Sequence, residues 1–182
     1  MSWADDKKSF SPGPIASYAA KQSNDNVTVA VAAYDTEDLA HTAFGKLDPN
    51  QYGVLPVLVI IQNDTDETVK LDRLEAQYTG IDGRHVDATP ASDVQLLGGG
   101  ERPRMPNGSP LPPLKKRKNP LNVWEIEGRS FAAKLLPPHE SAHGFFYFQT
   151  NYRPGSKFYL TGAKFAGSGK DIFYFEIPLD RK

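Results

Sequence analysis

Three short aromatic runs near the end of the sequence limit the fold more than any other feature. HGFFYFQT (143–150), KFYLTGA (157–163) and DIFYFEIPL (171–179) are rich in Phe and Tyr, and the turn-forming stretches NYRPGS and KFAGSG separate them. Aromatic and β-branched residues favour strands, whereas Gly and Pro favour the turns between them. The three runs therefore predict a three-stranded antiparallel meander.

Two apolar segments earlier in the chain predict strands that flank a short helix. VTVAVAAY (27–34) is β-branched and alternating, while VLPVLVIIQ (54–62) is apolar at consecutive positions, as expected of a central strand buried on both faces. Between them, residues 35–47 place their apolar side chains on one helical face. Asp35 is the expected N-cap of that helix.

The middle of the chain adds a hairpin and a second short helix. Residues 68–78 read as a half-buried strand, and Asp82 with Gly83 forms a hairpin turn signal that returns the chain. Residues 122–136 favour a helix over a strand, although Gly128 weakens it. Short strands at close intervals with Gly and Pro turns predict an all-β fold, an antiparallel β-sandwich with one or two short helices.

Composition divides the 182 residues into an N-terminal arm and a single domain that contains one long loop. Residues 1–26 are polar and contain the breaker-rich SPGP, so they predict a flexible N-terminal arm. Residues 27–182 are expected to form a single domain. Within it, residues 98–122 are dense in Gly, Pro and basic side chains, which predicts a long flexible loop with little to bury.

Charge and cysteine content narrow the possible partners and compartments. A net charge of -1 provides no general attraction to nucleic acid, which is bound through clustered Lys and Arg. The longest apolar run, 54–61, is too short to cross a bilayer, and the first ten residues lack the apolar core of a signal peptide. The absence of cysteine suits a reducing compartment or an exported protein without disulfides.

Two stretches carry a resemblance to known proteins. YGVLPVLVIIQN and LLPPHESAHGFFYFQT resemble segments of uncharacterised bacterial proteins with immunoglobulin-like β-sandwiches. The similarity covers residues 27–179. It implies an immunoglobulin-like sandwich in a periplasmic or secreted bacterial protein whose signal peptide is absent or trimmed, the alternative being a soluble cytoplasmic protein. It implies no established catalytic residues.

The stretch PPHESAH contains the HExxH pattern of zinc peptidases. On a helix, His139 and His143 would project from one face and bind Zn, and Glu140 would act as general base. A third ligand is also required, and no histidine follows His143. The strand-like FFYFQ begins just after Gly144, so residues 139–143 are expected to form a turn leading into a strand. A zinc-dependent hydrolase is the alternative hypothesis, and no cofactor is otherwise expected.

Two further patterns mimic functional motifs. AGSGKD (166–171) looks like a phosphate-binding loop, but the Walker spacing fails and a strand follows, so a Gly-rich hairpin turn is predicted. In PLPPLKKRK, Pro110, Pro113 and Lys115 match a PxxPxK ligand for SH3 domains. A peptide ligand presented by this loop is a second alternative function.

Aromatic residues on exposed strand faces are the remaining candidates for binding. Tyr147, Tyr159 and Tyr174 lie in the predicted terminal strands, where exposed rings would stack on a sugar or a protein partner. Because no complete catalytic set is present in the sequence, a non-enzymatic binding or accessory protein with a protein or carbohydrate partner is the leading hypothesis.

Overall fold

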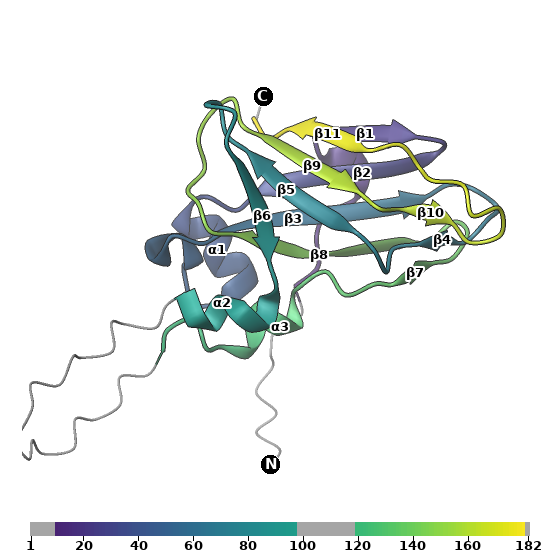
Figure 1. Cartoon of the computed structure of the whole chain (residues 1–182). Coiled ribbons are helices and arrows are strands. Elements are labelled where there is room, and N and C mark those ends of the chain that lie inside the picture. The colour runs from purple at the N-terminus through teal and green to yellow at the C-terminus, as the bar shows by residue number, and fades with distance from the viewer. Residues whose placement is uncertain (1–9, 98–118, 181–182) are drawn as a thin grey trace, which may run out of the picture.

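The computed structural model describes residues 10–97 and 119–180, and strands dominate them (Figure 1). The strands are β1 (Lys21–Asn24), β2 (Val27–Ala33), β3 (Leu55–Asn63), β4 (Val69–Lys70), β5 (Glu75–Thr79), β6 (His85–Thr89), β7 (Leu135–Leu136), β8 (Ser141–Phe148), β9 (Lys157–Thr161), β10 (Lys164–Phe165) and β11 (Phe175–Pro178). The helices are α1 (Glu37–Phe44), α2 (Ala91–Leu97) and α3 (Trp124–Gly128), with 3-10 turns at Ile15–Ser17 and Pro49–Tyr52. The prediction of an all-β protein with short helices is confirmed.

Eight strands form one antiparallel sheet that curls towards a barrel. Their order is β1-β2-β3-β8-β6-β5-β9-β11, and the two edge strands β1 and β11 come to lie side by side (Figure 1). A second, small sheet has the order β10-β4-β7. The all-β class is therefore as expected, whereas the finer prediction of an immunoglobulin-like sandwich is not confirmed, because the large sheet is barrel-like.

Side chains close the gap between β1 and β11, which we call the seam. The Gln22 Oε1 atom accepts a hydrogen bond from the Glu176 amide at 2.9 Å. The Asn24 Nδ2 atom donates to the carbonyl oxygens of Tyr174 at 2.9 Å and Phe173 at 3.3 Å. Two side-chain amides thus take the place of the backbone ladder that joins every other neighbouring pair in the sheet.

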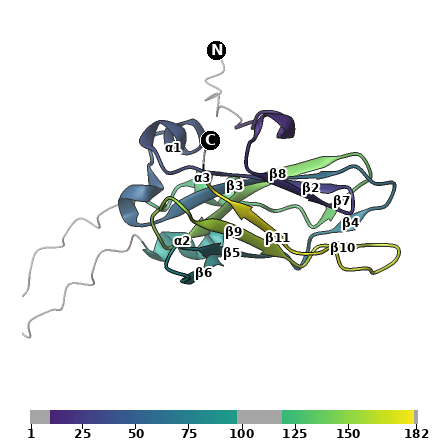
Figure 2. The same cartoon turned by 90° about the horizontal axis from the view of Figure 1, so that it is seen from above.

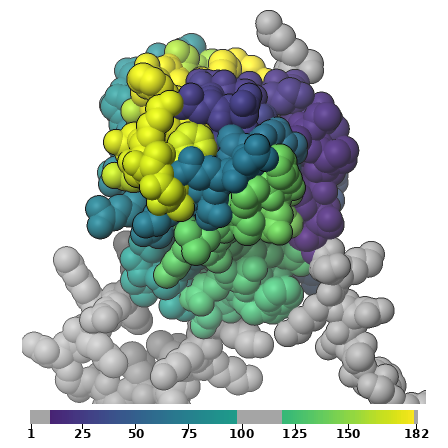
Figure 3. Space-filling model, turned by 90° about the vertical axis from the view of Figure 1, so that its right-hand side faces the viewer, coloured from purple at the N-terminus to yellow at the C-terminus, as the bar shows by residue number. Residues whose placement is uncertain are grey.

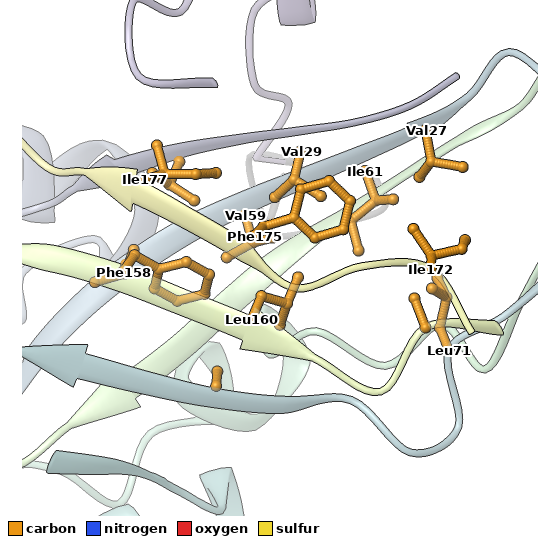
Figure 4. Close-up of a cluster of buried hydrophobic side chains, with 14 of the residues drawn as sticks. Val27, Val29, Val59, Ile61, Leu71, Phe158, Leu160, Ile172, Phe175 and Ile177 are labelled. Atoms are coloured by element: carbon orange, nitrogen blue, oxygen red, sulfur yellow. The ribbon is translucent and has the colours of Figure 1, made fainter. Parts of the chain in front are cut away.

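The barrel interior is filled by alternate residues of its strands. In Figure 4, side chains from β2, β3, β9 and β11 point towards one another. Phe148 and Phe158 meet edge to face, with ring centroids 6.1 Å apart. The labelled interior residues are Val27, Val29, Val59, Ile61, Leu71, Phe158, Leu160, Ile172, Phe175 and Ile177. This burial is the main source of stability.

A second apolar cluster joins the outer side of β2, β3 and β8 to the helices (Figure 2). Leu58 and Ile60 of β3 point into this layer, while their neighbours in β3 point into the barrel. The predicted burial of this strand on both faces is confirmed. Phe145 and Tyr147 of β8 enter the same layer, and the Tyr147 hydroxyl donates to the Ile126 carbonyl at 2.6 Å. The helices are thereby fixed on one half of the barrel.

The predicted C-terminal meander is wrong in its pairing. β9 pairs with β11 as expected, but β8 lies between β3 and β6, and β9 lies between β5 and β11. The reason is burial: β8 is apolar on both faces, with Phe145 outward and Phe148 inward, and both side chains are buried. Such a strand belongs in the middle of a sheet, beside β3, which is likewise buried on both faces.

Local boundaries differ from expectation in three places. The N-cap of α1 is Thr36, whose hydroxyl accepts from the Leu39 amide, and not Asp35. Helix α2 was not anticipated. The arm predicted over 1–26 contains β1, which is an edge strand of the main sheet because it pairs with β2.

The predicted loop over 98–122 ends earlier in the sequence than expected. Leu121 is buried, with 1% of its surface exposed, and packs in the helical layer. Residues 98–118 lie outside the described residues. At the two ends of that segment, the Asn119 Nδ2 atom donates to the Gln95 carbonyl, so the chain leaves and re-enters at neighbouring points.

This proximity predicts that residues 102–117 are dispensable for folding. Replacing them with a six-residue Gly-Ser linker should change the free energy of unfolding by only about 1 kcal/mol, since loop-closure entropy varies slowly with length. Urea denaturation compares the variant with the parent chain. Loss of cooperative unfolding in the variant would show that the segment contributes to the core.

Candidate functional site

The HExxH segment forms a turn and a strand. His139 has a left-handed backbone (φ 59°) in the turn before β8, and His143 lies within β8 opposite Ile60. The helix that would bring both imidazoles onto one face is therefore not formed, which confirms the prediction of a strand after a turn. Within residues 10–97 and 119–180, no three His, Asp or Glu side chains are grouped to hold a metal ion.

Each residue of this motif has a structural partner. The His139 Nε2 atom lies 2.8 Å from the Asp66 carboxylate, and the Glu140 carbonyl accepts from the Asn63 amide at 3.0 Å. The His143 ring contacts the Phe10 ring, with centroids 6.4 Å apart. The motif thus connects β8 to β3, to the loop after β3 and to the N-terminal segment.

His143 should give the fold a measurable pH dependence. Partial burial lowers its pKa below the ordinary 6.5, because the imidazolium would lose hydration. The unfolded chain then binds this proton at a higher pH than the folded chain does. The contribution of neutral His143 to the free energy of unfolding is complete above about pH 6.5. It is lost as the pH falls through the lower pKa that His143 has in the folded chain.

The test is urea denaturation of the parent chain and of His143→Gln at several pH values between about 5 and 8. The parent should lose more stability on acidification than the variant. His85→Gln, on an exposed strand away from Phe10, is the control. Equal slopes for the parent and His143→Gln would contradict the expectation.

The phosphate-loop lookalike is a hairpin turn, as predicted, and it binds an anion of its own chain. The amides of Gly167 and Ser168 both donate to one Glu67 carboxylate oxygen, at 2.7 Å and 2.8 Å. Figure 3 shows the C-terminal segment lying against the segment after β3 at this end of the barrel. Backbone amides of such turns favour negative charge. Here Glu67 provides it and joins the two loops.

The peptide motif falls outside the described part of the chain. Pro110, Pro113 and Lys115 belong to residues 98–118, so the hypothesis of an SH3 ligand stays a prediction. None of the helices in the described ranges has the length and apolar character needed to span a membrane.

Tyr147 is not part of an exposed surface, contrary to the sequence interpretation. Only 1% of its surface is exposed, and its ring packs against Phe44 with centroids 6.1 Å apart. Burial raises the pKa of the Tyr147 phenol, which therefore remains a hydrogen-bond donor to Ile126. Alternation placed Tyr147 on the outward side of β8 correctly, but α1 and α3 cover that side.

Tyr159 and Tyr174 do form an accessible aromatic pair. Their ring centroids are 5.2 Å apart and the rings are inclined by 31°. Tyr159 is half-buried, and 49% of Tyr174 is exposed. Both point away from the barrel interior, which is occupied by their chain neighbours Phe158, Leu160 and Phe175.

We call the surroundings of this pair the tyrosine face. It consists of His85 and Asp87 of β6, Glu75, Gln77 and Thr79 of β5, Lys157, Tyr159 and Thr161 of β9, and Tyr174 and Glu176 at β11. In Figure 2, α1 and the N-terminal 3-10 turn lie on the opposite side of the barrel from β9 and β11. The tyrosine face is therefore the half of the barrel that those elements leave uncovered.

Polar contacts order the tyrosine face across its strands. The Gln77 Nε2 atom donates to the Asp87 carboxylate at 2.6 Å, and the Lys157 ammonium lies 2.7 Å from the Glu176 carboxylate. Gln77 and Glu176 lie directly opposite Tyr159 on its two neighbouring strands. An aromatic ring is thus flanked on both sides by planar polar groups held in fixed positions.

Local sequence patterns could not predict which residues come together on this face. Alternation within residues 75–79 and 157–161 separates inward from outward side chains. Which strand lies beside which depends on pairing between distant segments, so Gln77 and Asp87 were not connected to the tyrosines. Phe173, next to Tyr174, is 72% exposed, although simple strand alternation would put it on the same side as the buried Phe175.

No protein-family model matches the chain, and no curated protein matches it. Function therefore has to be inferred from the geometry and chemistry of the described residues.

Proposed function

We propose that this protein is a non-catalytic binding or accessory module that engages its partner through the tyrosine face. The observation that carries the proposal is the accessible pair of Tyr159 and Tyr174. Aromatic rings with a polar end are favoured at recognition surfaces, because they bury a large area with little loss of side-chain entropy. Tyr159 lies in β9 and Tyr174 directly precedes β11, which pairs with β9, so the backbone positions both rings before any partner arrives.

The sequence motifs that pointed to catalysis have structural roles, which supports a binding function. His139 bonds to Asp66 in a turn, His143 lies in a strand, and the amides of the Gly-rich turn bond to Glu67. The tyrosine face, in contrast, has an aromatic pair whose rings contact each other and remain accessible. It is the stronger candidate for an external partner.

The test is a comparison of the parent chain with Tyr159→Ala/Tyr174→Ala on arrays of defined glycans and defined proteins. Binding to an identified probe should fall at least about tenfold in the double variant, as for loss of a recognition hot spot. Tyr52→Ala removes an exposed tyrosine outside the tyrosine face and should bind as the parent does. Binding that survives the double substitution would contradict the proposal.

We also propose an extracytoplasmic location in a bacterium, in keeping with the resemblance to exported β-sandwich proteins. Fractionation of cells that express the gene from its natural start, followed by detection of the protein, tests this. Recovery in the cytoplasmic fraction alone would contradict it.

A further inference from the structure

We propose that the ligand of the tyrosine face is an uncharged polysaccharide chain. Its sugar rings would stack on Tyr159 and Tyr174, and its hydroxyl groups would bond to the polar side chains on both sides. The inference rests on the proposed function, because it names the class of partner for the same face.

The two tyrosine rings provide a surface on which a sugar ring can stack. One side of a pyranose ring presents several C–H groups with slight positive charge, and the face of an aromatic ring is negative. Tyr174 is 49% exposed, and the neighbouring ring of Tyr159 supports it at a centroid distance of 5.2 Å. The pair therefore offers a firm aromatic surface for a sugar ring.

Polar side chains beside the tyrosines can form hydrogen bonds with the sugar hydroxyl groups. A polysaccharide presents hydroxyl groups that both donate and accept, so it is bound by planar side-chain groups that donate or accept hydrogen bonds at the edges of the stacked ring. The Gln77 amide and the Glu176 carboxylate lie opposite Tyr159 on either side. The Gln77 amide donates to Asp87, and the Glu176 carboxylate accepts from Lys157, and both groups retain further lone pairs. The groups are thus oriented and still able to bond.

Charge decides which polysaccharides fit. The tyrosine face has three carboxylates, of Glu75, Asp87 and Glu176, and one ammonium, of Lys157, which Glu176 pairs at 2.7 Å. The local charge is therefore negative. Repulsion disfavours pectate, alginate and nucleic acid, which bind to clusters of Lys and Arg. An uncharged chain meets no such barrier.

A protein partner is the less favoured occupant. The centres of protein interfaces are depleted in charged residues and enriched in aromatic and apolar groups. On the tyrosine face, charged and amide groups adjoin Tyr159 on both neighbouring strands, and none of the outward residues that define the face is aliphatic. A surface of this kind is better suited to a ligand that is itself covered with hydroxyl groups.

The experiment is affinity electrophoresis of the parent chain in native gels that contain one polysaccharide each. The uncharged set is xylan, glucomannan, mixed-linkage β-glucan and hydroxyethylcellulose, and the acidic set is pectate and alginate. At least one uncharged polysaccharide should retard the parent. Tyr159→Ala/Tyr174→Ala should weaken that retardation at least about tenfold, Gln77→Ala should weaken it less, and Tyr52→Ala should leave it unchanged.

Three results would overturn the inference: no retardation by any uncharged polysaccharide, retardation by the acidic set only, or retardation that the double tyrosine substitution leaves intact. Urea denaturation first establishes that each variant is folded. If no polysaccharide binds but an identified protein on the array is lost in the double variant, the carbohydrate inference fails while the proposed binding function stands. If neither kind of probe depends on the tyrosines, both fail.

Discussion

Replacing Gly144 with alanine should lower the free energy of unfolding by about 3 kcal/mol or more, because overpacking against backbone cannot relax without breaking structure. A Cβ atom at Gly144 would lie 2.4 Å from the Phe131 Cα atom and 2.5 Å from its nitrogen. The segment of Phe131 runs parallel to β8 and is held there by two bonds, from the Phe131 amide to the Phe145 carbonyl and from the Phe145 amide to the Arg129 carbonyl. The variant would have to push this segment away.

The measurement is urea denaturation, with Gly169→Ala as the control. Gly169 has a left-handed backbone (φ +68°) but no atom within 4 Å of its built Cβ position. Alanine there should cost only the backbone penalty, about 1–2 kcal/mol. If Gly144→Ala is no less stable than Gly169→Ala, the close approach of the two backbones is not important for the fold.

Phe148→Ala should destabilise the protein by about 3–5 kcal/mol, the usual loss for a large aromatic side chain in a core. Phe148 has 0% of its surface exposed, and its ring contacts Phe158 and Tyr78 inside the barrel. Truncation would leave a cavity among side chains from several strands, which cannot all move inward. The free energy of unfolding from urea denaturation is the quantity to compare.

Two phenylalanines serve as references for this prediction. Phe146 points towards the same interior but is only partly buried, so Phe146→Ala should lose less stability than Phe148→Ala. Phe173 is 72% exposed, and its truncation should stay within about 0.5 kcal/mol of the parent. A loss at Phe148 no larger than the loss at Phe173 would show that the Phe148 side chain is not in the core as described.

Local sequence patterns predicted the strands well because alternation and turn residues act over short distances. The continuous apolar run of β3 indicated burial on both faces, and Leu58 and Val59 do point into different clusters. Asp82 and Gly83 predicted the hairpin between β5 and β6. In each case the deciding interaction lies within a few residues along the chain.

Pairing between distant strands could not be predicted in the same way. The choice between a sandwich and a barrel-like sheet depends on whether β1 meets β11, and that contact relies on two polar residues, Gln22 and Asn24. Nothing in the polar sequence KQSN distinguishes such a strand from a solvated arm. The position of β8 beside β3 likewise depends on matching two strands about 85 residues apart in sequence, a separation at which local propensity has no influence.

The candidate site shows the same division. Alternation identified outward positions, and Tyr159 and Tyr174 are indeed accessible, whereas Tyr147 is outward but covered by helices. The sequence gives the side of the strand, and tertiary packing decides what covers that side. The aromatic residues after Gly144 correctly predict strand β8 in place of the helix on which zinc peptidases carry HExxH.

The seam also dictates the order in which the chain can complete its fold during synthesis. Gln22 and Asn24 leave the ribosome well before their partners, which lie 149 to 154 residues later in the chain. Until β11 has emerged, β1 has no neighbour on its outer edge, and the apolar interior of the half-formed sheet remains open to water or to chaperones. Because β11 follows every other strand of the sheet along the chain, the two amides of the seam can complete the barrel only after the other strands have been made.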